Sequence, residues 1–255
     1  MVEDAEINEL LAHYTKYFYA TRVTSADLKR EVYRLRYDVY CEEFGFENPN
    51  NFPARCEVDD YDSFSHHAAL IHRASSRIVG CIRLIPKIKG DATCLPVFRY
   101  CYQAFDPHAL ALGELASATS GEISRLSVAR SFRRRAEELS HRFPTYTGLR
   151  CDDDKRRNFP IIPMSLMCMV IRMAELNEIE TLYAMMEPRL YKILSEIGFA
   201  FGLMGSFIEY HGRRGPFQLN ANTCVSMLPQ KSRELYKLIA TELDDLGKQR
   251  QLKAS

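Results

Sequence analysis

The chain has 255 residues, of which 46% are hydrophobic and 26% are charged, and it contains no tryptophan. These fractions are typical of a globular protein, so they exclude disorder, collagen and coiled coil as descriptions of the whole chain. The 34 basic and 33 acidic residues give a net charge of +1. This balance provides no general reason to expect nucleic-acid binding.

The spacing of the cysteines and the shortness of the apolar runs indicate the cellular compartment of the protein. None of the eight cysteines forms a Cys-x-x-Cys pair, and several lie in apolar runs, so we expect buried free thiols and no metal site. Residues 1–9 lack the apolar core of a signal peptide. The longest apolar run, residues 159–171, is interrupted by Pro160 and Pro163 and is shorter than the roughly 20 residues that span a bilayer. We therefore expect a cytoplasmic protein without a transmembrane segment.

The amino-terminal part contains two predicted helices and a predicted pair of strands. Apolar side chains recur at helical spacing over residues 5–19 and 25–44. Residues 46–64 are rich in Asn, Pro and Asp, which is typical of a loop. Residues 68–72 and 78–85 are apolar and are separated by a short polar turn, so we expect a β-hairpin.

The rest of the chain alternates strands and helices around one charged segment. The patterns predict strands over residues 123–128, 181–186, 207–210 and 217–221, and helices over residues 165–176, 188–197 and 231–248. The last two strands would flank a basic turn. Residues 129–160 carry many charges, and we expect a mobile excursion there. The order of elements predicts one mixed α/β domain over residues 1–255, a central sheet flanked by helices. Residues 1–27 would form an amino-terminal helical extension and residues 229–255 a carboxyl-terminal helix.

One group of polar side chains connects the second predicted helix to the loop after it. Arg36 and Tyr40 are four residues apart and share one helix face, with Phe46 close behind. The carboxylates of Asp59 and Asp62 can accept the planar guanidinium of Arg36 bidentately. Two interpretations remain open at this point: one wall of a binding pocket, or a structural Arg–Asp pair that fixes the loop.

A second group lies on the predicted strands. Arg83 is in an apolar strand, so it either meets a carboxylate in the core or lines a polar cleft. In a regular strand Glu122 and Ser124 face one side and Arg125 the other, and a β-bulge would bring the three together. Because partial burial raises the pKa of a glutamate, Glu122 is either a general base or a structural carboxylate.

Two compositional features point to partners. Residues 130–157 contain nine basic and five acidic side chains, a patch that suits phosphate or an acidic protein surface, unless it is only a solvated loop. Eight of the nine methionines lie between residues 164 and 227. Flexible thioethers suit the wall of a tunnel for a variable apolar ligand, for which we nominate Met167, Met185 and Met186, unless the methionines are ordinary core filling.

In order along the chain, these motifs resemble a known family. Val32–Tyr40, Phe44–Phe46, Glu57–Asp62, Val79–Pro86 and Gly121–Val128 resemble acyl-homoserine lactone synthases. Ser127–Arg135, Met186–Leu190 and Tyr210–Pro216 are more similar to a sister group, the N-acyl amino acid synthases and the acyltransferase associated with PEP-CTERM/exosortase systems. The resemblance covers about residues 28–221 and implies a GNAT-like α/β fold.

The resemblance also implies transfer of a fatty acyl group from acyl carrier protein or coenzyme A to an amine. It implies that the site is lined or supported by Arg36, Tyr40, Phe46, Asp59, Asp62, Arg83, Phe98, Glu122 and Arg125. Of these, the residue matching Glu122 is the proposed base, and we expect the catalytic group to comprise Glu122, Ser124 and Arg125.

Two departures from the family pattern bear on the substrates. Position 46 is Phe where lactone synthases carry Trp, which disfavours a lactone synthase that uses S-adenosylmethionine. Arg133–Ala136 replaces the glycine-rich turn whose backbone amides hold the pyrophosphate of coenzyme A, which favours a protein-borne donor. We therefore expect acidic acyl carrier protein to dock on the arginines at Arg130, Arg133, Arg134 and Arg135.

The predicted function is an N-acyltransferase that acts on the amine of an amino acid or a similar small acceptor. Glu122 would be the general base, and backbone amides of its strand would form an oxyanion hole. No tightly bound cofactor, metal or nucleic acid is expected. The alternatives are a lactone synthase that uses S-adenosylmethionine and a non-catalytic acyl-binding module.

Overall fold

The computed structural model describes residues 2–88, 95–111, 119–133 and 161–254. Most of the excursion predicted at residues 129–160 therefore lies outside the described residues. Within the described part, no helix is both long enough and apolar enough to cross a membrane.

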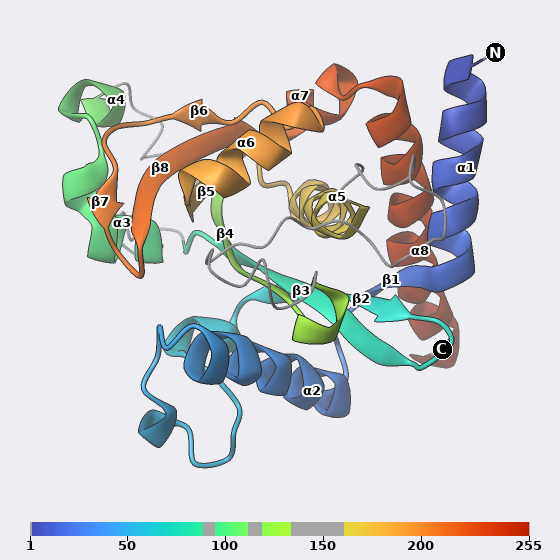
Figure 1. Ribbon diagram of the computed structural model, residues 1–255, viewed down its shortest axis with the longest axis horizontal. Helices are drawn as coiled ribbons and strands as arrows, with labels where there is room; N and C mark the ends of the chain where they lie inside the picture. Colours follow the sequence, from blue (N-terminus) through green and yellow to red (C-terminus); the bar gives the residue numbers. More distant parts are fainter. Residues whose placement is uncertain (1, 89–94, 112–118, 134–160, 255) are drawn as a thin grey trace.

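An eight-stranded sheet forms the centre of the fold, with strand order β1-β2-β3-β4-β5-β8-β6 and β7 paired to β8 (Figure 1). The strands are β1 (Phe18–Arg22), β2 (His66–His72), β3 (Arg77–Pro86), β4 (Ser120–Val128), β5 (Thr181–Met186), β6 (Gly202–Leu203), β7 (Ile208–Glu209) and β8 (Arg213–Asn220). All neighbouring strands are antiparallel except β4 and β5, which run parallel.

Helices cover both faces of this sheet. They are α1 (Val2–Tyr17), α2 (Ala26–Tyr37), α3 (Pro96–Cys101), α4 (Pro107–Ala111), α5 (Ile161–Leu176), α6 (Pro188–Glu196), α7 (Ala221–Met227) and α8 (Gln230–Ala254). A π-helical turn, η1 (Asp38–Glu43), extends α2, and the 3-10 turns η2 (Pro49–Asn51) and η3 (Asp60–Ser63) lie in the loop that follows. The result is the mixed α/β layer structure that the order of elements predicted.

The alternation of side chains along β2 explains the layers. Ala68 and Leu70 belong to the large core that contains α5 and α8, whereas Ala69 and Ile71 pack in a smaller core beneath α2. Because successive strand residues point to opposite faces, one short apolar strand serves both cores. Helix α5 is apolar almost all round, and nearly all of it is buried.

The structure differs from the sequence predictions at two places that matter for the site. Residues 1–27 are not only a helical extension, because residues 18–22 form β1, which pairs with β2. The residues interpreted as a basic turn before residue 217 are strand: β8 begins at Arg213. His211 and Gly212 both have positive φ, so the reversal before β8 is tighter than the sequence pattern indicated.

Strands β4 and β5 separate after a short stretch of pairing. The parallel register pairs Ser120 with Thr181 and ends at Glu122 with Tyr183. Beyond this point β4 continues to Val128 and β5 to Met186 without further pairing. The splayed ends therefore leave room for a ligand between two central strands.

Candidate active site

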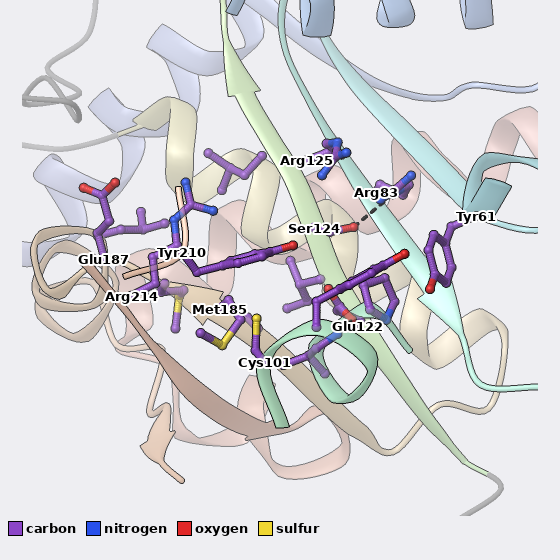
Figure 2. Close-up of a pocket in the computed structure, with 18 of the residues that line it drawn as sticks. Tyr61, Arg83, Cys101, Glu122, Ser124, Arg125, Met185, Glu187, Tyr210 and Arg214 are labelled. Atoms are coloured by element: carbon purple, nitrogen blue, oxygen red, sulfur yellow. Dashed lines mark hydrogen bonds between the residues drawn. The ribbon is translucent and has the colours of Figure 1, made fainter. Parts of the chain in front are cut away.

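A cavity of about 290 Å³ lies where β4 and β5 separate. Its polar end is lined by side chains from β3, β4 and the loop before β2, and its apolar end by α5, β5 and α6. Figure 2 shows Glu122 and Ser124 along β4 on one side, with Tyr210 and Arg214 reaching in from the other. This division into a polar and an apolar end suits a substrate that is itself part polar and part aliphatic.

Glu122 lies at the point where the two strands part and is 5% exposed. Burial raises the pKa of this carboxyl to about 7, although the N–H of Val97 donates a hydrogen bond of 2.7 Å to Oε2 and lowers it in part. Among the described residues, no other group forms a hydrogen bond with the carboxylate of Glu122. Glu122 is therefore poised to gain or lose a proton near neutral pH.

A β-bulge follows Glu122 on the same strand. Ser124 pairs with Arg83 and Ser127 with Cys81, so the two residues between them, Arg125 and Leu126, face a single residue of β3. Arg125 has φ of 51°, an uncommon conformation for a residue with a side chain. As expected for a bulge, Glu122, Ser124 and Arg125 all line the cavity.

Behind the polar end, Arg36 is fully buried and holds two carboxylates. Its Nη1 and Nη2 donate to the two oxygens of Asp62 at 2.6 and 2.9 Å, and its Nε donates to Glu57 at 2.5 Å. Burial alone would raise the pKa values of both carboxyls, but the adjacent guanidiniums hold them below their usual range. The predicted pairing with Asp62 is present. Arg36 does not line the cavity, so the structural role left open by the sequence applies.

Arg83 and Arg125 complete this ion-pair network. Arg83 donates to Asp59 at 2.6 Å and to Ser124 Oγ at 2.9 Å, a bond drawn in Figure 2. Arg125 donates to Glu57 at 2.8 Å and to Asp59 at 3.2 Å. Each of these guanidiniums is therefore matched by carboxylates, which is what makes buried charges tolerable. Glu57 is an essential member that the sequence analysis quoted in a motif but assigned no role.

All three nominated methionines line the cavity. Met167 and Met186 belong to the large core, whereas Met185 packs against the small core that contains Phe98. Met167 comes from α5 and the other two from β5, and α6 adds two leucines to this wall, Leu190 and Leu194. Flexible side chains at such a wall adapt to an aliphatic chain of variable shape. The prediction of an acyl tunnel is compatible with this placement and stays a prediction.

The opposite wall is built by the hairpin of β7 and β8 and by an aromatic group. Arg214 stacks on the ring of Phe46 at 5.3 Å, and His211 contacts the same ring edge-on. Phe46, predicted to bind substrate, does not line the cavity but supports a residue that does. Arg214 was missed as a site residue because the sequence pattern placed it in a turn.

Of two other residues nominated for the site, Tyr40 lines the cavity and Phe98 does not. Tyr40 lies beneath the guanidinium of Arg125 at 5.1 Å. Phe98 packs with Phe105 and Tyr183 in a small core behind the cavity and does not line it. Phe98 therefore positions the polypeptide around Val97, whose N–H holds Glu122.

Of the arginines nominated for docking, Arg130 is exposed, whereas Arg133 is buried. Arg133 forms an ion pair with Glu43 and lies over the ring of Phe44 at 5.1 Å, so its charge faces inward. Arg134 and Arg135 lie outside the described residues. The structure thus removes Arg133 from the exposed patch that was expected to meet a partner.

The lining of the cavity also includes a thiol, that of Cys101. Burial, together with the charge of Glu122, raises the pKa of the cavity-lining thiol of Cys101 to about 11, so it is a poor nucleophile near neutral pH. The described residues contain no cluster of three or more His, Cys, Asp or Glu side chains that could hold a metal ion.

Comparisons with known proteins agree with this fold. Residues 35–140 match the family model of the acetyltransferase (GNAT) domain. The structure is similar to BjaI, a CoA-dependent acyl-homoserine lactone synthase solved with SAM and isopentyl-CoA, with TM-score 0.56 and 18% identity over 86% of this chain and 87% of that chain.

Two further structures extend the comparison. FeeM, an N-acyl amino acid synthase from uncultured soil microbes, has TM-score 0.56 and 15% identity over 83% of this chain and 94% of that chain. The AHL synthase LasI has TM-score 0.52 and 16% identity over 80% of this chain and 89% of that chain. Among curated proteins, none matches this chain.

These findings confirm the GNAT-like fold that the sequence motifs implied, and the family match agrees with an acyltransferase. The link to exosortase systems stays a prediction. The chain has the GNAT fold, in the form shared by acyl-homoserine lactone synthases and an N-acyl amino acid synthase.

Proposed function

We propose that this protein is an N-acyltransferase that moves a fatty acyl group from a thioester donor to the amine of an amino acid or a similar small acceptor. The observation that carries the proposal is the position of Glu122. It is a buried carboxyl with a pKa of about 7, at the junction of a polar and an apolar chamber and beside a β-bulge.

The donor would enter between the splayed ends of β4 and β5, with its acyl chain toward Met167, Met185 and Met186. Arg125 and Leu126 have no one-to-one partners in the β3 register and none in β5. Their backbone N–H groups are therefore candidates to donate to the thioester carbonyl oxygen. Such preorganised donors stabilise the oxyanion of a tetrahedral intermediate.

Glu122 would then take a proton from the ammonium group of the acceptor, directly or through a water. The free amine attacks the carbonyl carbon, a C–N bond forms and the C–S bond breaks. The second proton of the amine leaves with the thiolate, so the products are an amide and a free thiol. No covalent enzyme intermediate is needed, which agrees with the inert thiol of Cys101.

Acyl carrier protein is the donor that we propose, with acyl-CoA as the alternative. The support is the basic sequence Arg133–Ala136, which lacks the glycines of a pyrophosphate-binding turn, and the exposed guanidinium of Arg130. Because charge attraction to an acidic carrier mainly raises the association rate, its effect on KM falls as salt is added. The proposed link to exosortase systems rests on the sequence motifs alone.

The test measures whether free thiol is released from hexadecanoyl-CoA and from hexadecanoyl acyl carrier protein when an acceptor is added. Release is monitored by chromatography, which separates the acylated donor from the free one. We expect release that requires an amino acid mixture, with a lower KM for the carrier donor at low salt. Stimulation by S-adenosylmethionine alone would identify a lactone synthase instead. Donor binding without release under any condition would identify an acyl-binding module and refute the proposal.

A further inference from the structure

We propose that Arg214 binds the carboxylate of the acceptor, so that the substrate is an amino acid with a free carboxylate and not a simple amine. This inference rests on the proposed function and deepens it. The sequence motif Tyr210–Pro216 was quoted for the family resemblance without any role. The structure places two of its side chains, Tyr210 and Arg214, in the wall opposite Glu122.

The hairpin geometry selects Arg214 over its neighbour. Arg213 and Arg214 are consecutive in β8, so their side chains point to opposite faces. Arg213 is exposed and lies over the ring of Phe207 at 5.3 Å, away from the cavity, whereas Arg214 lines the cavity. The chain thus contains a matched pair of arginines of which only one faces the site.

The charge of Arg214 is not matched by a carboxylate. The other cavity-lining arginines, Arg83 and Arg125, are paired with Asp59 and Glu57. No ion pair to Arg214 is formed by any described residue, Glu187 of the same cavity included. Nε of Arg214 is a buried atom without a hydrogen-bond partner. A partly buried guanidinium with open donors is suited to a carboxylate that arrives with the substrate.

Phe46 holds this guanidinium in place. The ring lies 5.3 Å from the guanidinium carbon of Arg214 and is itself packed against Phe44 and Tyr40. Stacking fixes the plane of the side chain while leaving its edge donors available. The aromatic residue at position 46 therefore acts on the acceptor through Arg214.

The placement matches the two charges of an amino acid. Glu122 and Arg214 line the same cavity, together with Tyr210 and Cys101. Figure 2 shows Tyr210 extending from the side of Arg214 toward Ser124 and Glu122. An acceptor bound there would present its ammonium to Glu122 and its carboxylate to Arg214.

The experiment compares each of the twenty standard amino acids with its primary amide, which keeps the shape and the amine but removes the negative charge. Hexadecanoyl-CoA is the donor, and the variants are Arg214→Gln, Arg214→Lys and the control Arg213→Gln. For the best acceptor, Arg214→Gln should lower kcat/KM about 10- to 150-fold, the range for a hydrogen bond to a charged group, mainly through KM. The kcat/KM of Arg214→Gln for the amide should stay close to that of wild type, and Arg213→Gln should behave as wild type with both acceptors.

Binding measured without donor separates this inference from the proposed function. Ligand-observed NMR of the amino acids and amides reports binding whether or not acyl transfer occurs. If wild type transfers no acyl group, but Arg214→Gln no longer binds the amino acids and still binds the amides, the carboxylate site stands and the proposed function fails. If Arg214→Gln binds amino acids as wild type does, or if wild type prefers amides, the inference is overturned. Should Arg214→Gln not fold, Arg214→Lys, which keeps the charge but loses the fork, must show the same selective loss.

Discussion

Replacing Glu122 by Gln tests the environment of the proposed base without relying on any substrate. Gln keeps the shape and still accepts the hydrogen bond from Val97, but it cannot ionise. In the folded protein the pKa of Glu122 is about 7, raised by burial from 4.5, so the unfolded chain loses this proton first as pH rises. The unfolding free energy of wild type therefore decreases as the pH rises from 4.5 to about 7, and the full loss is present above pH 7.

The size of the effect follows from the difference between the two pKa values. A shift of that size corresponds to about 3 kcal/mol, at about 1.4 kcal/mol for each pKa unit. Relative to wild type, Glu122→Gln should thus gain about 3 kcal/mol of unfolding free energy between pH 4.5 and pH 8. Other titrating groups are common to both proteins and cancel in the difference.

The assay is urea unfolding of both proteins at several pH values, with Glu196→Gln as the control. Glu196 is an exposed carboxylate on α6, so its replacement should leave the pH dependence as in wild type. A stability difference between Glu122→Gln and wild type that does not change with pH would refute the raised pKa. In that case, Glu122 would be ionised through the whole range and would not be poised as a base.

Three further variants probe the walls of the site. Arg36→Met removes the guanidinium shared by Glu57 and Asp62, which then keep only Arg125 and Arg83 as arginine partners. It should cost about 3–5 kcal/mol in urea unfolding, whereas a cost below about 1 kcal/mol would contradict the network. Leu190→Trp fills the apolar end and should shift the preferred donor to shorter acyl chains in a chain-length series, and an unchanged preference would place the chain elsewhere. Phe46→Ala removes the support of Arg214 and should raise the acceptor KM with little change in kcat, and an unchanged KM would argue against that support.

The sequence alone located the strand that lines the cavity, because the residues that matter lie together in one local motif. Glu122, Ser124 and Arg125 follow one another in a motif, and the family resemblance placed them in the site without knowledge of the fold. The bulge could be raised only as a possibility, because a register shift depends on the partner strand. The three nominated methionines line the cavity, and their density is visible in the sequence, although which of them face a cavity is not.

Long-range pairing is what the sequence could not provide. Glu57 binds both Arg36 and Arg125, and the second of these lies 68 residues away. Arg133 appeared to be one of a run of surface arginines, but Glu43, 90 residues earlier, draws it inward. Arg214 was assigned to a turn because the positive φ values at His211 and Gly212, which make the reversal tight, cannot be read from composition.

Formation of an amide that contains the nitrogen of the acceptor tests the central claim most directly. The purified protein is incubated with hexadecanoyl acyl carrier protein and a mixture of ¹⁵N-labelled amino acids, and the extracted lipids are analysed by mass spectrometry. The account predicts N-hexadecanoyl amino acids that carry the label, formed by wild type and reduced at least about tenfold by Glu122→Gln. Absence of any labelled amide with wild type, or equal amounts from the two proteins near neutral pH, would contradict it.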